Sequence, residues 1–269
     1  MSKALYPLVA VDVGNNRLKF GLFDQPSENG LPEPAAVHVS DGNSSLEALA
    51  DWLDDRLPPG GRWWIGSVNR PGTTRLLQWL QKARPKDQIT LLAAGDLPLV
   101  VALKRPDMVG IDRLLDAVAA NRLRCAAASA VLVDVGTAIT VDLVAADGSF
   151  QGGAILPGIA LSARALHAFT DLLPLVDVRE LSTPPPALGT STVAALRSGL
   201  FWGAVGAIRQ LLEVLPGRSA GPSDVFLTGG AGPTVAGLLG DAARHVPNLT
   251  LAGIALTAQW QSSQARESG

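Results

Sequence analysis

Two short segments of the sequence combine an aspartate with a glycine two positions later: Asp12-Val13-Gly14-Asn15 and Asp134-Val135-Gly136-Thr137. Glycine has no side chain to hold a ligand away, so the backbone amides of such a turn can approach phosphate oxygens closely. The aspartate can hold Mg²⁺ through water, which suits a metal that keeps most of its hydration while it bridges nucleotide phosphates. Taken singly, each segment is more simply an ordinary hairpin turn, because Asp and Gly are standard turn residues.

The two turns lie in equivalent settings. Apolar residues 8–11 precede the first turn and residues 130–133 precede the second, and both runs predict buried strands. Alternating residues over 17–24 and 139–145 predict a hairpin partner after each turn. Two matched copies of strand, turn and strand favour phosphate binding over two unrelated turns.

A third candidate segment is Gly110-Ile111-Asp112-Arg113, at the start of a helix that apolar spacing predicts over residues 111–123. Phosphorylation of an alcohol needs a carboxylate near the hydroxyl to accept its proton, and Asp112 could do this from a fixed helix end. Arg113 could then bind an anionic substrate or a phosphate group. The local pattern equally allows Asp112 to serve only as a helix cap.

The composition excludes several classes of partner. Only 17% of the residues are charged and the formal net charge is -2, so we expect neither nucleic acid nor a membrane as a partner. Cys125 is the single cysteine, which excludes an internal disulfide and any multi-cysteine zinc site and places a metal on oxygen ligands. The longest apolar stretch, 125–146, contains Asp134 and Asp142 and is too polar for a membrane span. We expect a cytoplasmic protein.

The length of 269 residues and the 47% apolar content suffice for two lobes. The repeated strand, turn and strand resemble the superfamily of acetate and sugar kinases, chaperone ATPases and actin. That resemblance implies an α/β fold of duplicated ribonuclease H-like (actin-like ATPase) lobes with a nucleotide cleft between them. We assign residues 1–111 to an N-terminal lobe and 112–269 to a C-terminal lobe, whose last helix, 251–260, could pack back on the first lobe. The glycines at 229, 230 and 232 resemble the adenosine contact of the superfamily.

A more specific resemblance follows from the order of four motifs. Asp-x-Gly-Asn, Gly-x-Asp-Arg, Asp-x-Gly-Thr-Ala-x-Thr-x-Asp and Gly-Gly-x-Ile-x-Pro-Gly begin at Asp12, Gly110, Asp134 and Gly152. Taken alone, the last of these segments, 152–158, would be a loop shaped by glycine and proline. Together and in this order, the motifs resemble type III pantothenate kinase over nearly the whole chain.

The resemblance implies transfer of the γ-phosphate of ATP to the primary hydroxyl of pantothenate, the first step of coenzyme A synthesis. It implies that Asp112 is the proton acceptor and that Asp134 binds a monovalent cation, K⁺ or NH₄⁺, beside the Mg²⁺ that Asp12 holds through water. It also implies a homodimer, in which Thr192 serves the site of the neighbouring subunit. The implied ATP-binding residues are Asp12, Val13, Gly14, Asn15, Asn16, Arg17, Leu18, Lys19 and Thr137, and the implied pantothenate-binding residues are Gly110, Ile111, Asp112, Arg113 and Thr192.

The sequence departs from the family pattern at two places. Asn16 stands where the family usually has Ser or Thr, and no aromatic residue occurs over 99–106, just before Gly110. Alternation along the strand also leaves open whether Lys19 faces the ligand or solvent. Two alternative functions remain: another small-molecule kinase of the superfamily, acting on a sugar or a carboxylate, and a nucleotide-binding regulator that performs no transfer.

Overall fold

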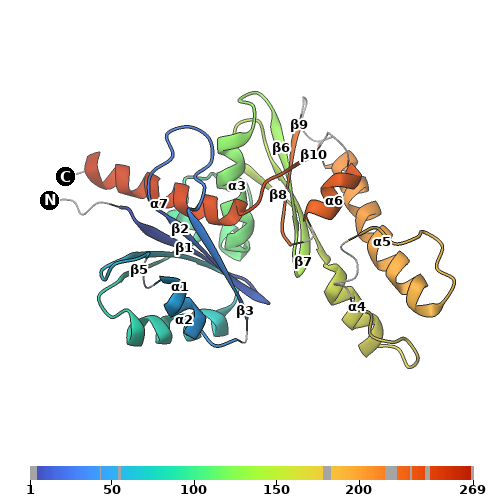
Figure 1. Ribbon diagram of the computed structural model, residues 1–269. Coiled ribbons are helices and arrows are strands. Elements are labelled where there is room, and N and C mark those ends of the chain that lie inside the picture. The colour runs from blue at the N-terminus through green and yellow to red at the C-terminus, as the bar shows by residue number, and fades with distance from the viewer. Residues whose placement is uncertain are drawn as a thin grey trace. The chain divides into compact units, whose positions relative to one another are not determined.

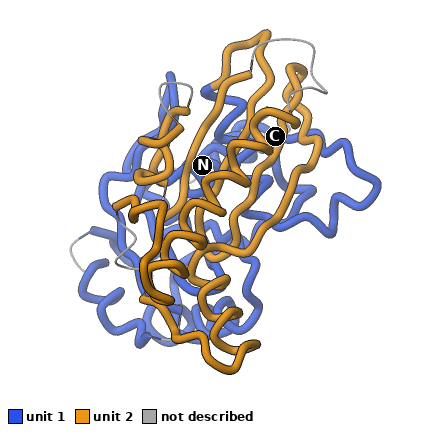
Figure 2. The backbone as a smooth tube through the Cα atoms, turned by 90° about the vertical axis from the view of Figure 1, so that its right-hand side faces the viewer, with its two compact units in different colours: residues 1–123, 248–269 blue, residues 124–247 orange. Residues whose placement is uncertain are grey.

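The computed structural model describes residues 5–42, 44–53, 56–177, 183–215, 223–230, 232–239 and 243–267. Its chain forms two compact units, Met1–Leu123 with Asn248–Gly269, and Arg124–Pro247 (Figure 2). Each unit contains a mixed five-stranded sheet with helices, so the α/β prediction is confirmed. We call them unit 1 and unit 2. No helix in the described ranges is long and apolar enough to cross a membrane.

Unit 1 is built on a sheet with the strand order β3-β2-β1-β4-β5 (Figure 1). Its strands β1, β2 and β3 pair antiparallel, whereas β4 and β5 run parallel to β1. The elements of this unit are β1 (Leu8–Val13), β2 (Arg17–Phe23), β3 (Ala36–Asp41), α1 (Glu47–Leu53), β4 (Arg62–Ser67), α2 (Arg70–Ala83), β5 (Gln88–Leu91), α3 (Ile111–Leu123) and α7 (Leu249–Glu267), with short 3-10 turns at Ala94–Asp96 and Pro106–Met108.

Both faces of the central strands in unit 1 are covered, which explains why β1 is apolar almost throughout. Val9, Val11 and Val13 face a core that includes leucines of α1 and α2. Helix α7 packs against α3 and against β1, β2 and β4. The two helices cross closely, because a Cβ atom on Gly253 would lie 2.0 Å from the carbonyl oxygen of Leu115. Helix α3 packs against both α7 and β4, and Asp112 lies in its first turn.

Unit 2 has the strand order β10-β9-β6-β7-β8, with β6, β7 and β8 antiparallel and β9 and β10 parallel to β6. Valines of β6 and β7 form a core with Ile208 of α5 and Val235 of α6. Its elements are β6 (Ser129–Val135), β7 (Ala138–Val144), β8 (Phe150–Pro157), α4 (Ile159–Ala168), α5 (Thr192–Val214), β9 (Ser223–Thr228), α6 (Gly232–Leu239) and β10 (Ala243–His245).

The two sheets share one topology, since β3-β2-β1-β4-β5 and β8-β7-β6-β9-β10 follow the same path from third strand to last. The predicted duplication is thus present in the strand order of both units. The contact units divide the chain after Leu123, because α3 packs on α7 and β4. This is a different kind of division from the expected lobes 1–111 and 112–269, which stay a prediction. The segment 152–158, which alone indicated a loop, lies mostly in strand β8.

Candidate functional site

The first candidate turn connects β1 to β2 in a tight hairpin. Val13 pairs with Leu18, and the amide of Gly14 donates to the carbonyl oxygen of Arg17 at 3.0 Å. A further amide, that of Gly42 just after β3, donates to the carbonyl oxygen of Asn16 at 2.7 Å. The backbone of the turn is therefore fixed from within and from the neighbouring strand.

Asp12 and Lys19 are direct cross-strand partners, so their side chains leave the same face of the hairpin. The Nζ atom of Lys19 lies 3.8 Å from Oδ2 of Asp12, with both side chains partly shielded from solvent. The direction of Lys19, which alternation left open, is therefore toward Asp12. The pair places a positive charge and a carboxylate side by side at the end of the hairpin.

Asp112 is half-buried in the first turn of α3, and its Oδ1 atom accepts a hydrogen bond from the amide of Arg113 at 2.8 Å. Burial raises the pKa of Asp112, and this outweighs the opposite effects of that hydrogen bond and of the positive charges on Arg113 and Lys19. A raised pKa makes the carboxylate a stronger proton acceptor than a solvated aspartate. Lys19 is thus ion-paired with Asp12, and its charge makes a small contribution that lowers the pKa of Asp112.

Gly110 lies directly beside the carboxyl group of Asp112. A Cβ atom at this position would lie 2.6 Å from Oδ1 of Asp112. The carboxyl group therefore folds back over the residue that precedes α3. A larger residue at 110 would displace the carboxylate that we expect to act as the base.

A cavity of about 780 Å³ within unit 1 reaches this loop, with Gly110 and Ile111 in its wall. The rest of the wall comes from the end of β4 and from the chain between Leu92 and Val109. None of these lining residues is aromatic, which agrees with the missing aromatic residue before Gly110. The cavity has the size of a small-molecule site, and its wall ends at Ile111, the residue before the half-buried Asp112.

The second turn connects β6 to β7 in unit 2 and is shorter than the first. Val135 pairs with Ile139, and the amide of Gly136 donates to the carbonyl oxygen of Ala138 at 3.0 Å. The amide of Gly158, just after β8, donates to the carbonyl oxygen of Thr137 at 3.0 Å. Thr137, an expected ATP contact, is thus fixed through its backbone.

Asp134 occupies the same register position as Asp12 but has a different neighbourhood. Its cross-strand partner is Thr140 rather than a lysine, and its Oδ1 atom is buried. Gly229 lies against it with a φ of +92°, and a Cβ atom there would be 2.3 Å from that oxygen. This enclosed carboxylate oxygen, which lies against Gly229, could contribute to a site for a cation that takes oxygen ligands.

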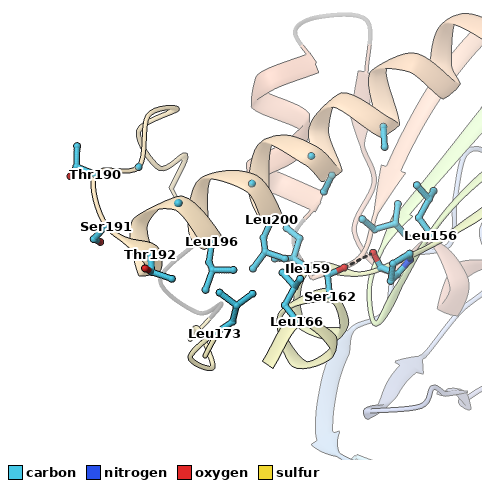
Figure 3. Close-up of a pocket in the computed structure, with 18 residues that line it drawn as sticks. Leu156, Ile159, Ser162, Leu166, Leu173, Thr190, Ser191, Thr192, Leu196 and Leu200 are labelled. Carbon is cyan, nitrogen blue, oxygen red and sulfur yellow. Dashed lines mark hydrogen bonds between the residues drawn. The ribbon is translucent and has the colours of Figure 1, made fainter. Parts of the chain in front are cut away.

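Thr192 lies at the start of α5, beside a groove of about 870 Å³ between α4 and α5. Figure 3 shows Thr192 at one end of this groove and Leu156 near the other, with leucines of both helices between them. The hydroxyl of the preceding residue, Ser191, accepts from the amide of Ala194 and so caps the helix. Within unit 2, the position of Thr192 is therefore set by the capped start of α5.

Asn69, whose side chain contacts the first turn, was not identified from the sequence. Asn69 caps α2, and its Nδ2 atom donates to the carbonyl oxygens of Gly14 at 3.1 Å and Asn15 at 3.4 Å. An available signal was Asn69 followed by Pro71, the residue types that favour a helix start. That signal predicts the cap but not the contact with the turn.

Among the described residues, no group of three or more His, Cys, Asp or Glu side chains is placed to hold a metal ion. A single carboxylate such as Asp12 fits Mg²⁺ in the form the ion takes beside nucleotides, because Mg²⁺ keeps several waters and uses phosphate oxygens as ligands.

Comparisons with known proteins identify the family of the chain. The family model described as type III pantothenate kinase matches residues 8–214, a range that contains both turns, Asp112 and Thr192. The type III pantothenate kinase of Paramagnetospirillum magneticum is 34% identical over 85% of this chain and 88% of its own. The one from Phenylobacterium zucineum is 29% identical over 96% of this chain and 99% of its own.

Among solved structures, a Sinorhizobium meliloti protein proposed to be a 2-dehydro-3-deoxygalactonokinase aligns with a TM-score of 0.51 at 16% identity, covering 96% of this chain and 99% of that one. At this identity the likeness concerns the fold alone. The family match and the relatives, which span most of the chain, together show that this protein belongs to the type III pantothenate kinase family.

Proposed function

We propose that this protein phosphorylates pantothenate with ATP to give 4′-phosphopantothenate, with Asp112 as the general base. The observation that carries the residue assignment is the position of Asp112: half-buried, with a raised pKa, next to Gly110 in the cavity wall and within the field of Lys19. A small alcohol in this cavity would meet a carboxylate suited to accept its proton.

In the proposed reaction, Asp112 takes the proton of the primary hydroxyl as that oxygen attacks the γ-phosphorus of ATP. The bond from the γ-phosphorus to the bridging oxygen breaks, and ADP leaves with that oxygen. Lys19 and the amides of the 12–19 hairpin would bind phosphate oxygens. The proposal is supported by the position of Lys19, whose charge lies at the end of the hairpin beside the turn backbone. We assign Thr137 as a further ATP contact.

We assign one cation to the aspartate of each turn. Asp12 would hold Mg²⁺ through water, and the ion would reduce the negative charge of the phosphates that Lys19 also meets. Asp134 would bind the monovalent cation, because its Oδ1 atom is enclosed and lies against Gly229. Oxygens of carboxylates and carbonyl groups are the usual ligands of K⁺.

The pantothenate site would comprise Gly110, Ile111, Asp112 and Arg113. Pantothenate carries a carboxylate, and the guanidinium of Arg113 offers a charge-assisted, two-pronged contact for such a group. Without an aromatic residue in the cavity wall, contacts to the body of the substrate would come from aliphatic side chains and the backbone.

We further propose a homodimer in which Thr192 completes the pantothenate site of the neighbouring subunit. The surface of α4 and the segments that flank α5 is unusually apolar: Phe169 is 87% exposed, Leu172 86% and Leu188 80%. These exposed residues and the leucines that line the groove in Figure 3 are apolar side chains of the kind that a protein–protein contact buries. A second copy of the chain would cover them.

The dimer proposal can be tested by mixing two inactive variants, Asp112→Asn and Thr192→Ala. If each site takes Asp112 from one subunit and Thr192 from the other, half of the mixed dimers' sites regain both residues. Random exchange should then restore about a quarter of the normal activity. No recovery in mixtures that exchange subunits would show that each chain supplies its own Thr192.

The catalytic function is tested by measuring ADP release with pantothenate, sugars, glycerol and acetate as acceptors. Of these four kinds of acceptor, only pantothenate is expected to support ADP release. Turnover with a sugar but not with pantothenate would favour another kinase of the superfamily, and ATP binding without any turnover would favour a regulator. A cytoplasmic location, which suits an enzyme that draws on cellular ATP, belongs to the same proposal and is testable by fractionation.

A further inference from the structure

Asn69 joins the start of α2 to the first phosphate turn. Its Oδ1 atom accepts from the amide of Gly72 at 3.0 Å, which caps the helix. Its Nδ2 atom donates to the carbonyl oxygens of Gly14 and Asn15. One amide side chain thus does two separate tasks, and only the second concerns the turn.

The backbone of Asn69 is itself held by two hydroxyl groups. The amide of Asn69 donates to Oγ of Ser67 at 3.0 Å, and the hydroxyl of Thr73 donates to the carbonyl oxygen of Asn69 at 3.0 Å. The Oγ1 atom of Thr73 also lies 2.6 Å from Oγ of Ser67, so the three residues form a closed cluster. Asn69 is therefore a fixed support rather than a surface side chain that touches the turn by chance.

The contacts of Asn69 determine where the amides of the turn point. In a trans peptide the carbonyl oxygen of one residue and the amide hydrogen of the next point in opposite directions. Holding the carbonyl oxygens of Gly14 and Asn15 toward Asn69 directs the amides of Asn15 and Asn16 away from it. Those are the groups that a phosphate-binding turn must present.

We propose that Asn69 is a positioning residue for ATP, which holds the first turn in the form that presents its amides to phosphate. The inference rests on the proposed role of residues 12–19 in ATP binding. Without Asn69, part of the binding free energy would be spent on ordering the turn, so the affinity for ATP would fall while the pantothenate site kept its shape.

Asn69→Ser separates the two tasks of the side chain. Serine is as good a helix cap as asparagine, but its hydroxyl is too short to span to Gly14. We expect the KM for ATP to rise about tenfold, as the loss of two hydrogen bonds implies, while the KM for pantothenate and the thermal midpoint stay within error. Asn69→Asp also keeps the cap but turns a carboxylate oxygen toward the two carbonyl groups, so its KM for ATP should rise further.

Two further variants make the outcome decisive. Ser45→Ala removes another hydrogen bond at a helix start in unit 1, that from the amide of Glu47, and should leave the KM for ATP unchanged. Lys19→Met reports on the turn itself. If the KM for ATP rises in Lys19→Met but stays normal in both Asn69 variants, the role of Asn69 is overturned and the role of the turn in ATP binding stands. A normal KM in all three would overturn the role of the turn as well, and an equal rise in Ser45→Ala would assign the effect to helix stability.

Discussion

The two aspartate turns have the same place in the same sheet topology, yet they differ in length and in what faces the aspartate. Four residues, 14–17, lie between the paired Val13 and Leu18 in the first turn, whereas three, 136–138, lie between Val135 and Ile139 in the second. The first aspartate faces Lys19 and the second faces Thr140. One scaffold therefore carries a carboxylate paired with a lysine in unit 1 and a carboxylate opposite a neutral threonine in unit 2.

The supports of the two turns differ in the same sense. A glycine directly after the third strand donates to a carbonyl oxygen of the turn in both units. A Cβ atom on Gly42 would be 3.0 Å from the nearest turn oxygen, whereas on Gly158 it would be 2.4 Å from the oxygen of Gly136. The second turn is thus held by close backbone packing, and the longer first turn has the additional side-chain support of Asn69. This difference suits the phosphate and cation roles proposed for them.

The largest expected effect tests whether the acid–base chemistry belongs to unit 1. Asp112→Asn keeps the size of the side chain but removes the proton acceptor, so kcat should fall about a hundredfold or more while the protein stays folded. Steady-state kinetics with ATP and pantothenate at saturation measure this. Asp51→Asn, on the exposed side of α1, is the matched control. Near-normal turnover in Asp112→Asn would refute its assignment as the base.

The next comparison concerns the two supporting glycines. Gly158→Ala should destabilise the protein by about 3 kcal/mol, because the added methyl group overlaps two backbone oxygens that cannot move independently. Gly42→Ala should cost about 1 kcal/mol or less, since a shift of a few tenths of an ångström relieves its contact. Urea unfolding of both variants gives the two values. Equal losses, or a larger loss for Gly42→Ala, would contradict the view that the second turn is the more tightly packed.

Asp134→Asn tests the cation role of the second turn. Removing the negative charge should reduce the stimulation by K⁺ and raise the KM for ATP, each by about tenfold. Titration of K⁺ at several ATP concentrations measures both. Asp147→Asn is the control. Asp147 is an exposed carboxylate of the same unit that accepts hydrogen bonds from Ser149, and this variant should respond to K⁺ as the unaltered protein does. An unchanged K⁺ response in Asp134→Asn would remove this residue from the cation site.

Much of the fold was predictable because its signals are local. Helix α3 has the bounds that periodicity predicts, and the hairpin strands β1, β2, β6 and β7 end within two residues of the predicted positions. Strand β8 was not evident, since Gly153 and Pro157 normally indicate a loop. The structure explains the glycine: it pairs with Asp142, and a Cβ atom there would be 2.0 Å from the carbonyl oxygen of Val141. A packing requirement between strands leaves no mark that periodicity can detect.

The candidate site was predictable to a similar degree. The two aspartate turns and Asp112 have motifs whose residue types indicate their chemistry. The direction of Lys19 required the register of β1 and β2, because a single strand offers two faces. The contact of Asn69 with Gly14 joins residues 55 positions apart, so only the folded chain could show it.

The smallest expected effect concerns the charge that distinguishes the first turn from the second. Lys19 favours the ionised form of Asp112, and burial alone already raises the pKa of that carboxyl group. Lys19→Met should therefore raise the pKa further, by less than about one unit. Because Asp112 must be ionised to accept a proton, the pH below which activity is lost should be higher in Lys19→Met than in the unaltered protein.

The measurement is the acidic inflection in the pH profile of kcat/KM for pantothenate at saturating ATP. Lys82→Met, on an exposed position of α2, is the control that keeps the total charge change the same. If the inflection in Lys19→Met stays in place or moves to lower pH, the charge of Lys19 does not lower the pKa of Asp112 in the working enzyme. The role of Lys19 would then be limited to ATP binding.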